Sequence, residues 1–179
     1  MMLIIGKGRL ARALEVKWSR AVLVGRPEFD FARQDDCDSM VSQYPTPKIV
    51  INTLGCITDN IWQNITVNLL APVYLTSCYV HLSGCHIINI SSASAWWPSY
   101  PGMALQSFSY KMAKESLSQF GRHINRINVD DPSKALVSTI EPGRFKTPMS
   151  NFTGREVQDV VDCVELVIAR RIQHISCVK

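Results

Sequence analysis

The chain has 179 residues, a length that normally forms one domain with a sizeable buried core. Its 46% apolar and 19% charged residues exclude a disordered chain, and a net charge of +4 without a long basic run argues against a nucleic-acid-binding tail. No apolar stretch approaches the roughly 18 residues of a membrane span. We therefore expect one folded domain over residues 1–179, with neither a nucleic-acid nor a membrane partner.

Short apolar runs alternate along the chain with longer periodic segments. The runs predict strands at 2–6, 21–25, 48–52, 85–90, 134–140 and 174–178, with a short extended piece near 29–31. The periodic segments predict helices at about 9–18, 33–43, 60–80, 107–126 and 154–172. Parallel strands buried on both faces and joined by crossover helices have this order. We predict an α/β fold, a doubly wound, mainly parallel sheet of about 6–7 strands with helices on both faces.

A glycine-rich segment follows the first predicted strand and opens the first predicted helix. It reads Gly6-Lys7-Gly8-Arg9-Leu10-Ala11 and fits G-x-G-x-x-A. Glycines permit the tight turn and the close approach of a pyrophosphate, and the amides at a helix N-terminus favour negative charge. The segment therefore predicts a dinucleotide-binding site.

The end of the second predicted strand indicates which dinucleotide binds. An acid there would bind a ribose hydroxyl, whereas an arginine would accommodate a 2′-phosphate. The chain has Arg26 at this place, no acid before Glu28, and the cations Lys7 and Arg9 in the glycine-rich segment. This pattern favours NADP(H), although Arg26 read alone is also compatible with a plain surface residue.

Tyr110 and Lys114 lie four positions apart in a predicted helix and therefore share one face. A tyrosine that transfers protons near neutral pH needs its pKa lowered from about 10, which a nearby ammonium favours. Such a pair also occurs on ordinary helix surfaces, and Lys114 read alone fits a solvated position. The pair is a candidate catalytic site.

Together, these segments resemble the short-chain dehydrogenase/reductase family over nearly the whole chain. The matching segments, in the family's order, are the glycine-rich turn at 6–11, Asp30, Asn52-Thr53-Leu54-Gly55, Asn68, Ile90-Ser91-Ser92, Tyr110 with Lys114, and the turn from Pro142-Gly143 to Thr147. The resemblance implies a compact Rossmann-type domain and an NADP(H)-dependent oxidoreductase acting on a small-molecule carbonyl or alcohol.

The resemblance also implies a role for each catalytic residue. Tyr110 would transfer the proton, Ser92 would hydrogen-bond the reacting oxygen, Lys114 would hold the nicotinamide ribose, and Asn68 would hold a water. Read without the family, Asn68 also fits a core polar group and Ser92 a strand-end cap. The implied cofactor contacts are Gly6, Lys7, Gly8, Arg9, Leu10, Arg26, Asp30, Asn52, Gly55, Tyr110, Lys114, Pro142, Gly143 and Thr147.

Several features depart from the family's pattern. The glycine-rich turn is one residue shorter, and the segment between the second and third predicted strands is abbreviated. The serine-to-tyrosine spacing is wider, through a tryptophan-rich stretch at 94–107, which leaves Ser91, Ser92 and Ser94 as candidates for the active-site serine. The region after Pro148, where the family often has a substrate lid, is short.

These departures leave alternative functions open. The shortened lid region is compatible with a sensor or scaffold that binds NADP(H) without turnover, whereas Tyr110 argues for an enzyme. A keto-sugar nucleotide reductase is disfavoured because the chain lacks an additional substrate domain. The family resemblance implies a homodimer or homotetramer through the helices at 60–80 and 107–126.

The cysteines indicate the compartment. They are scattered, with no C-x-x-C pair and no histidine at zinc-ligand spacing, at Cys37, Cys56, Cys78, Cys85, Cys163 and Cys177. This arrangement predicts neither disulfides nor a metal site. The apolar start reaches only to Gly6, too short for a secretory signal. We expect a cytoplasmic protein.

Overall fold

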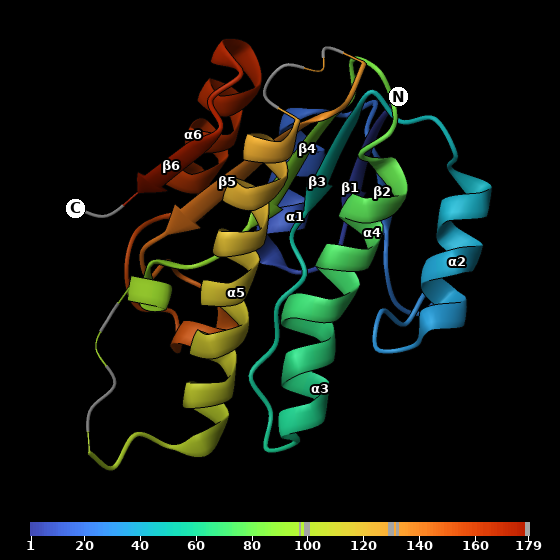
Figure 1. Cartoon of the computed structure of the whole chain (residues 1–179). Coiled ribbons are helices and arrows are strands. Elements are labelled where there is room, and N and C mark those ends of the chain that lie inside the picture. The colour runs from blue at the N-terminus through green and yellow to red at the C-terminus, as the bar shows by residue number, and fades with distance from the viewer. Residues whose placement is uncertain (97, 99–100, 129–130, 132, 178–179) are drawn as a thin grey trace.

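The computed structural model describes residues 1–96, 98, 101–128, 131 and 133–177. Six strands of this part form one parallel sheet in the order β2-β1-β3-β4-β5-β6 (Figure 1). They are β1 (Met2–Ile5), β2 (Val22–Val24), β3 (Ile49–Asn52), β4 (His86–Ile90), β5 (Leu136–Pro142) and β6 (His174–Cys177). The doubly wound parallel sheet and its six expected strands are confirmed.

The extended piece expected near 29–31 is wrong as a strand. Residues 26–28 form a turn there, and no strand pairing involves 29–31 in the described part of the chain. Phe29 stacks on Phe31 with 6.3 Å between ring centroids, and Phe31 is buried in the core. The apolar residues therefore anchor a loop to the core.

The helices lie where the periodic segments predict them. They are α1 (Arg9–Lys17), α2 (Gln34–Gln43), α3 (Ile61–Ile65), α4 (Ala71–Tyr79), α5 (Leu105–Ile127) and α6 (Val157–Arg170). A π-helical turn, Thr66–Leu70, joins α3 to α4, so the helix expected at 60–80 is a continuous helical segment with a local widening. Such widenings are rare and often mark functional sites.

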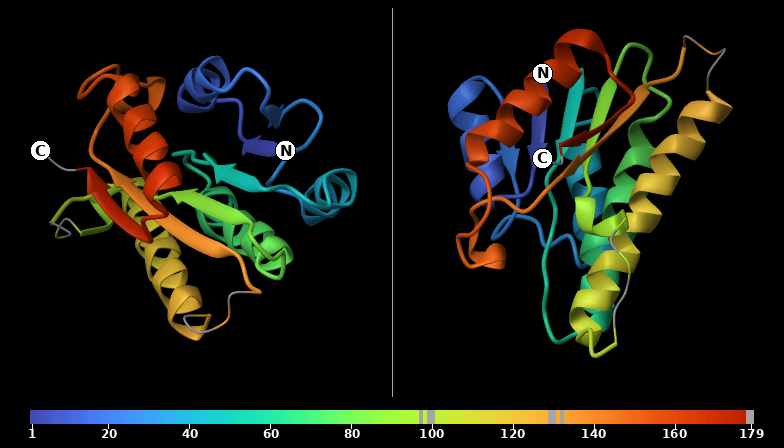
Figure 2. Two further views of the ribbon diagram at one scale, coloured as in Figure 1. Left: turned by 90° about the horizontal axis from the view of Figure 1, so that it is seen from above. Right: turned by 90° about the vertical axis from the view of Figure 1, so that its left-hand side faces the viewer.

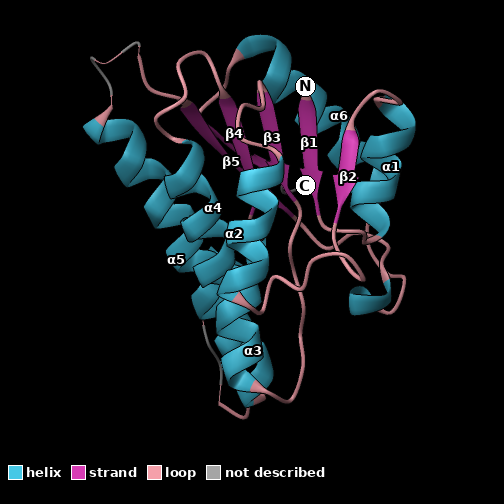
Figure 3. Ribbon diagram, turned by 90° about the vertical axis from the view of Figure 1, so that its right-hand side faces the viewer, coloured by secondary structure: helices cyan, strands magenta, loops and turns pink. Residues whose placement is uncertain are grey.

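Two cores cover the two faces of the sheet. In β1, Leu3 and Ile5 point into one core and Ile4 into the other, as the two-residue period of a strand requires. Helices α1 and α6 cover one face, and α2, α4 and α5 cover the other (Figures 2 and 3). This arrangement buries both faces of every central strand.

The strand order reverses beside β1, and this reversal positions the site. From β1 the chain crosses to β2 on one side, whereas β3 pairs with the other side of β1. The connections from β1 and β3 therefore leave on opposite faces and open a crevice at the carboxyl ends of the strands, where ligands bind in such sheets. None of the helices in the described residues has the length and apolar character to cross a membrane.

Candidate active site

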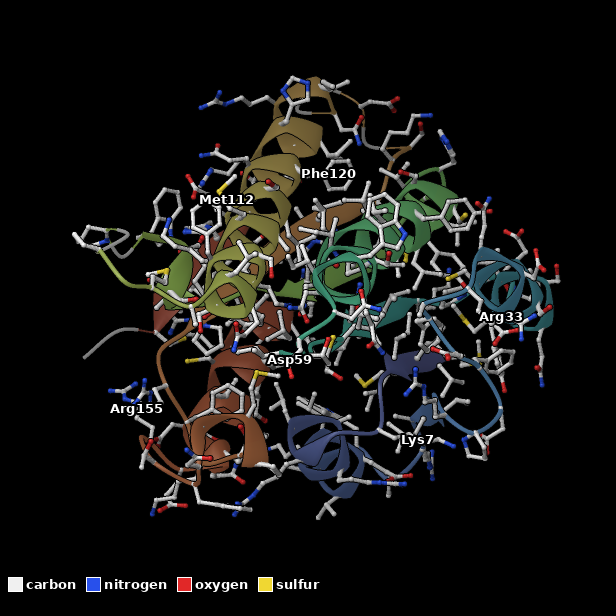
Figure 4. All side chains as sticks on the ribbon, turned by 90° about the horizontal axis from the view of Figure 1, so that it is seen from below. Lys7, Arg33, Asp59, Met112, Phe120 and Arg155 are labelled. Atoms are coloured by element: carbon white, nitrogen blue, oxygen red, sulfur yellow. The ribbon has the colours of Figure 1, made fainter. Side chains whose placement is uncertain are left out.

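A cleft of about 1120 Å³ lies at the carboxyl edge of the sheet. Figure 4 views the molecule from this side and labels Lys7, which lies in the loop after β1. The loops after β1, β3, β4 and β5 line the cleft together with one face of α5: residues 7–11, 53–55, 57, 90–92, 94, 98, 103, 107, 110, 111, 114, 142–145 and 147–152. Segments far apart in the sequence therefore form one site.

The glycine-rich turn forms one end of the cleft. Gly6 has a φ of +109°, and a side chain there would meet the Thr53 hydroxyl at 2.5 Å, so only glycine fits. Gly8 is the N-cap of α1 and has open space where a side chain would be. Lys7, Gly8, Arg9 and Leu10 line the cleft, whereas Gly6 does not. The N-terminal amides of α1 therefore face a space that accepts phosphate.

The charged residues beyond β2 pair with one another. The Arg26 guanidinium donates to both Asp30 carboxylate oxygens, at 2.8 and 2.9 Å, and Lys7 pairs with Glu28. The hydrogen bond from Lys7 lowers the pKa of Glu28. Neither Arg26 nor Asp30 lines the cleft. Arg26 and Lys7, the basic groups expected near a 2′-phosphate, are thus paired with acids at the surface. Surface ion pairs contribute little free energy, so a phosphate can replace the acids at little cost.

Lys114 is buried beneath the cleft, with only 2% of its surface exposed. Its Nζ donates to the Leu54 carbonyl at 2.8 Å and to the Ile90 carbonyl at 2.9 Å, and no carboxylate among the described residues pairs with it. Burial lowers the pKa of Lys114 to about 7. The alternative of a solvated helix position is therefore wrong.

Tyr110 lies one helical turn before Lys114 and is half-buried in the wall of the cleft. The Lys114 Nζ lies 6.0 Å from the centre of the Tyr110 ring. Burial raises the pKa of Tyr110, and the nearby Ser92 hydroxyl opposes this effect. Lys114 was expected to lower the pKa of Tyr110, and this expectation is wrong, because the pKa of Tyr110 is raised. Tyr110 is accordingly a protonated phenol that can donate a proton.

The three candidate serines divide into two orientations. The Ser91 hydroxyl faces α5, where it donates to the Lys114 carbonyl at 2.7 Å and accepts from Ser118 at 2.8 Å. The Ser92 and Ser94 hydroxyls line the cleft and lie 2.8 Å apart. The Ser91 hydroxyl is thus occupied away from the cleft, and two serines remain beside Tyr110.

Asn68 lies in the π-helical turn and is completely buried. Its amide donates to the carbonyls of Cys56 and Asn64, both at 2.7 Å, and its oxygen accepts the Cys56 amide at 3.1 Å. Asn68 does not line the cleft. It holds the loop after β3, in which Gly55 lies between Asn68 and Lys114. A Cβ atom added at Gly55 would lie only 3.9 Å from the Lys114 Nζ.

The remaining expected contacts lie at the ends of β3 and β5. Asn52 is buried, pairs with Asn89 at 3.3 Å and accepts the Leu54 amide, and so shapes the loop without lining the cleft. Gly55, Pro142, Gly143 and Thr147 line the cleft. Thr147 also caps a 3-10 turn at Pro148–Ser150, which supports the far wall.

A buried charge cluster behind this wall was not predicted from the sequence. The Glu141 carboxylate, 1% exposed, accepts the Trp96 indole N–H at 2.5 Å, and the His174 Nε2 lies 3.3 Å from the same carboxylate oxygen. The Arg122 guanidinium lies 4.7 Å from the centre of a Trp96 ring. The available signal was a single charged residue, an acid, near the end of a strand that is otherwise uncharged. Trp97, Ser99 and Tyr100 of the tryptophan-rich stretch lie outside the described residues.

The residues of the cleft fit a dinucleotide and suit acid–base chemistry. One end offers helix amides and cations, and the other offers a phenol, two hydroxyls and a buried amine. Within the described part of the chain, no group of three or more His, Cys, Asp or Glu residues could hold a metal ion.

No family model matches the chain, and no curated protein does. Solved structures do match. A short-chain dehydrogenase from Sphingobium yanoikuyae in complex with NADPH has a TM-score of 0.80 at 18% identity, over 98% of this chain and 86% of that one. BdcA in complex with NADPH has a TM-score of 0.76 at 16% identity, over 98% and 92%.

A third solved structure is the bulky-bulky ketone specific alcohol dehydrogenase from Comamonas testosteroni. Its TM-score is 0.79 at 16% identity, over 98% of this chain and 84% of that one. These likenesses show that the chain has the Rossmann-type fold of the short-chain dehydrogenases/reductases. The Rossmann-type fold expected from the family resemblance is therefore confirmed.

Proposed function

We propose that the chain is an NADP(H)-dependent oxidoreductase of the short-chain dehydrogenase/reductase family that reduces a small carbonyl compound or oxidises the corresponding alcohol. The observation that carries this proposal is the convergence of Tyr110, Ser92 and the buried Lys114 in one cleft that begins at the glycine-rich turn. The NADPH complexes among the similar solved structures support the choice of cofactor.

In the proposed reaction the bound cofactor supplies the hydride, and the protein supplies position, charge and a proton. Tyr110 donates its phenolic proton to the substrate oxygen as negative charge develops there, and Ser92 donates a hydrogen bond to the same oxygen. Lys114 holds the ribose beside the reacting ring. Asn68 keeps the loop around Gly55 in place, and its role as the holder of a proton-relaying water stays a prediction.

The proposed cofactor contacts follow the shape of the cleft. Lys7, Gly8, Arg9 and Leu10 would contact the phosphates, while Pro142, Gly143 and Thr147 would contact the nicotinamide end. Arg26 would leave Asp30 and pair with a 2′-phosphate, since a guanidinium binds phosphate in two parallel hydrogen bonds.

The test is NADPH oxidation across a panel of carbonyl compounds, with the Tyr110→Phe variant measured in parallel. We expect turnover of at least one ketone or aldehyde by the unchanged chain and none by the variant. Binding of NADPH without turnover above that of Tyr110→Phe would establish the sensor or scaffold instead. Failure to bind NADPH would contradict both.

We also propose a homodimer or homotetramer in the cytoplasm. The outer surfaces of α3, the π-helical turn and α5 expose large apolar side chains, which supports association through these helices: Ile61, Trp62, Leu70, Leu105, Phe108 and Met112. All six cysteines are free thiols, which supports a reducing compartment. Light scattering at several protein concentrations tests the assembly.

A further inference from the structure

Two serine hydroxyls meet beside Tyr110, and their hydrogen-bonding capacity decides what each can do. The Ser92 and Ser94 hydroxyl oxygens lie 2.8 Å apart, and the Ser94 backbone amide donates to the Ser92 hydroxyl at 3.2 Å. A hydroxyl has one hydrogen to donate and two lone pairs to accept with. The Ser94 amide can only donate, so one lone pair of Ser92 is already used.

The direction of the hydroxyl–hydroxyl bond determines which serine can serve the substrate. If Ser94 donates to Ser92, both lone pairs of Ser92 are occupied and its hydrogen is free to point into the cleft. If Ser92 donated to Ser94, it would have no hydrogen for the substrate oxygen. Both hydroxyls are half-buried and line the cleft with Tyr110, and only the first arrangement leaves the Ser92 hydrogen for the substrate oxygen that the proposed reaction requires.

The backbone holds the two serines in this relation. Both lie in or beside the 3-10 turn Ala93–Trp96, in which the Ala95 amide donates to the Ser92 carbonyl at 3.1 Å. Ala93 and Ala95 are buried, whereas Ser92 and Ser94 line the cleft. The Trp96 indole is fixed at the end of the turn by Glu141. A rigid turn of this kind preorganises the pair before any ligand binds.

We propose that Ser94 is a positioning residue that donates its hydroxyl hydrogen to Ser92 and thereby directs the Ser92 hydrogen to the substrate oxygen. The inference rests on the proposed oxidoreductase function. No proton leaves either serine, because Tyr110 supplies the transferred proton and the serines only share hydrogen bonds. A donor into Ser92 also strengthens the bond that Ser92 makes, because consecutive hydrogen bonds polarise one another.

The pair explains an ambiguity in the sequence. Ser92 and Ser94 both fit the position of the active-site serine because both face the cleft, and the enlarged stretch after β4 lets them act in sequence. Ser91 cannot join them, since its hydroxyl is bound to α5. The geometry therefore assigns the two cleft serines different tasks, with Ser92 touching the substrate and Ser94 acting through Ser92.

A double-mutant cycle on Ser92 and Ser94 tests this division. Ser92→Ala should lower kcat by about 10²–10³, the usual effect of losing a preorganised donor. Ser94→Ala should lower kcat by about tenfold, because Ser92 remains but is no longer held in one orientation. The double variant should match Ser92→Ala within about twofold, since a residue that acts through another adds nothing once that other is absent.

Two further variants separate positioning from simple packing. Ser94→Thr keeps the hydroxyl and should restore kcat to within about threefold of the unchanged chain. Ser77→Ala is the matched control, because that exposed hydroxyl binds only the Val73 carbonyl on α4, and it should change nothing. Additive losses in the double variant, or a larger loss from Ser94→Ala than from Ser92→Ala, would overturn the proposal.

A second measurement needs no turnover and so separates this proposal from the proposed function. Tyrosinate absorbance, taken as the difference between each chain and the same chain carrying Tyr110→Phe, reports the pKa of Tyr110. Ser94→Ala should raise this pKa in a chain that has Ser92 and leave it unchanged in a Ser92→Ala chain. An equal pKa with and without the Ser94 hydroxyl overturns the inference even if NADPH-dependent reduction is found.

Discussion

Two charged side chains are buried almost equally deeply in this protein, and their surroundings are opposite. Lys114 is 2% exposed, and within the described part of the chain it bonds only to the neutral carbonyls of Leu54 and Ile90. Glu141 is 1% exposed, accepts from Trp96 and lies beside the basic groups of His174 and Arg122. Lys114 has no opposite charge beside it among the described residues, whereas Glu141 has the Arg122 guanidinium 4.0 Å away, although its Oε1 accepts no hydrogen bond there.

The difference distinguishes a residue expected to serve catalysis, Lys114, from one expected to serve stability, Glu141. A buried charge is more stable when partners of opposite charge and hydrogen bonds replace water, and Glu141 has an opposite charge in Arg122 and a hydrogen bond from Trp96. Lys114 has hydrogen bonds but no opposite charge, so burial lowers its pKa to about 7. Strongly perturbed groups in clefts are typical of catalytic sites. We therefore expect activity to depend on the Lys114 side of the molecule and stability on the Glu141 side.

The largest expected effect is on turnover at the Lys114 side. Tyr110→Phe removes the proton donor and should lower kcat by about 10³ or more, roughly 4 kcal/mol, while NADPH affinity stays nearly unchanged because the ring still packs. Steady-state kinetics and a cofactor titration measure the two quantities. Tyr74→Phe is the control, since Tyr74 pairs with Asp38 away from the cleft. A variant retaining more than about a tenth of the rate would remove Tyr110 from its role.

The next effect tests the comparison directly through the free energy of unfolding. Glu141→Ala removes the carboxylate from between Arg122 and His174 and should destabilise the chain by about 3–5 kcal/mol. Lys114→Met replaces an uncompensated cation with an apolar side chain of similar length and should be neutral or stabilising, although activity is lost. Urea unfolding followed by circular dichroism measures both.

A conservative variant shows whether charge or hydrogen bonding matters at Glu141. Glu141→Gln keeps an acceptor for the Trp96 indole and should lose less stability than Glu141→Ala. If instead Lys114→Met destabilises the chain as much as Glu141→Ala does, both buried charges stabilise the fold. The proposed difference between Lys114 and Glu141 would then be wrong.

The pKa of Lys114 also predicts how stability depends on pH. An unfolded chain binds a proton at this lysine up to about pH 10, whereas the folded chain releases it above about pH 7, so stability should rise with pH between these values. From pH 7 to 9, the unchanged chain should gain about 2 kcal/mol relative to Lys114→Met. Urea unfolding of both chains at three pH values measures the gain, and parallel curves would contradict the lowered pKa.

Local patterns in the sequence predicted most of the fold and one end of the site. The strands, helices and glycine-rich turn are specified by spacing, and the positive φ of Gly6 matches the reason for a glycine there. These features involve neighbouring residues, so one sequence suffices to infer them.

Contacts between distant segments could not be predicted in the same way. The buried cluster brings together Trp96, Arg122, Glu141 and His174 from four separate elements, and no local pattern links them. The Ser92–Ser94 contact depends on a 3-10 turn that replaces the two-residue period directly after β4. The pairing of Arg26 with Asp30 depends on the course of a loop. These features follow from tertiary geometry.

The smallest expected effect concerns the cofactor, at the end of the cleft far from both buried charges. The unchanged chain should bind NADPH more tightly than NADH, because Lys7 and Arg26 can exchange Glu28 and Asp30 for a 2′-phosphate. Arg26→Asp should reverse the preference, with a loss in NADPH affinity of about tenfold, or 1.4 kcal/mol, that shrinks at high salt. Fluorescence titration with both cofactors measures this change. Arg20 is exposed and precedes β2, at the amino end of the strand and away from the cleft. Arg20→Asp therefore controls for the change in net charge. Equal affinities for the two cofactors in the unchanged chain would contradict this prediction. They would show that Glu28 and Asp30 stay paired with Lys7 and Arg26, so that the chain does not distinguish NADPH from NADH.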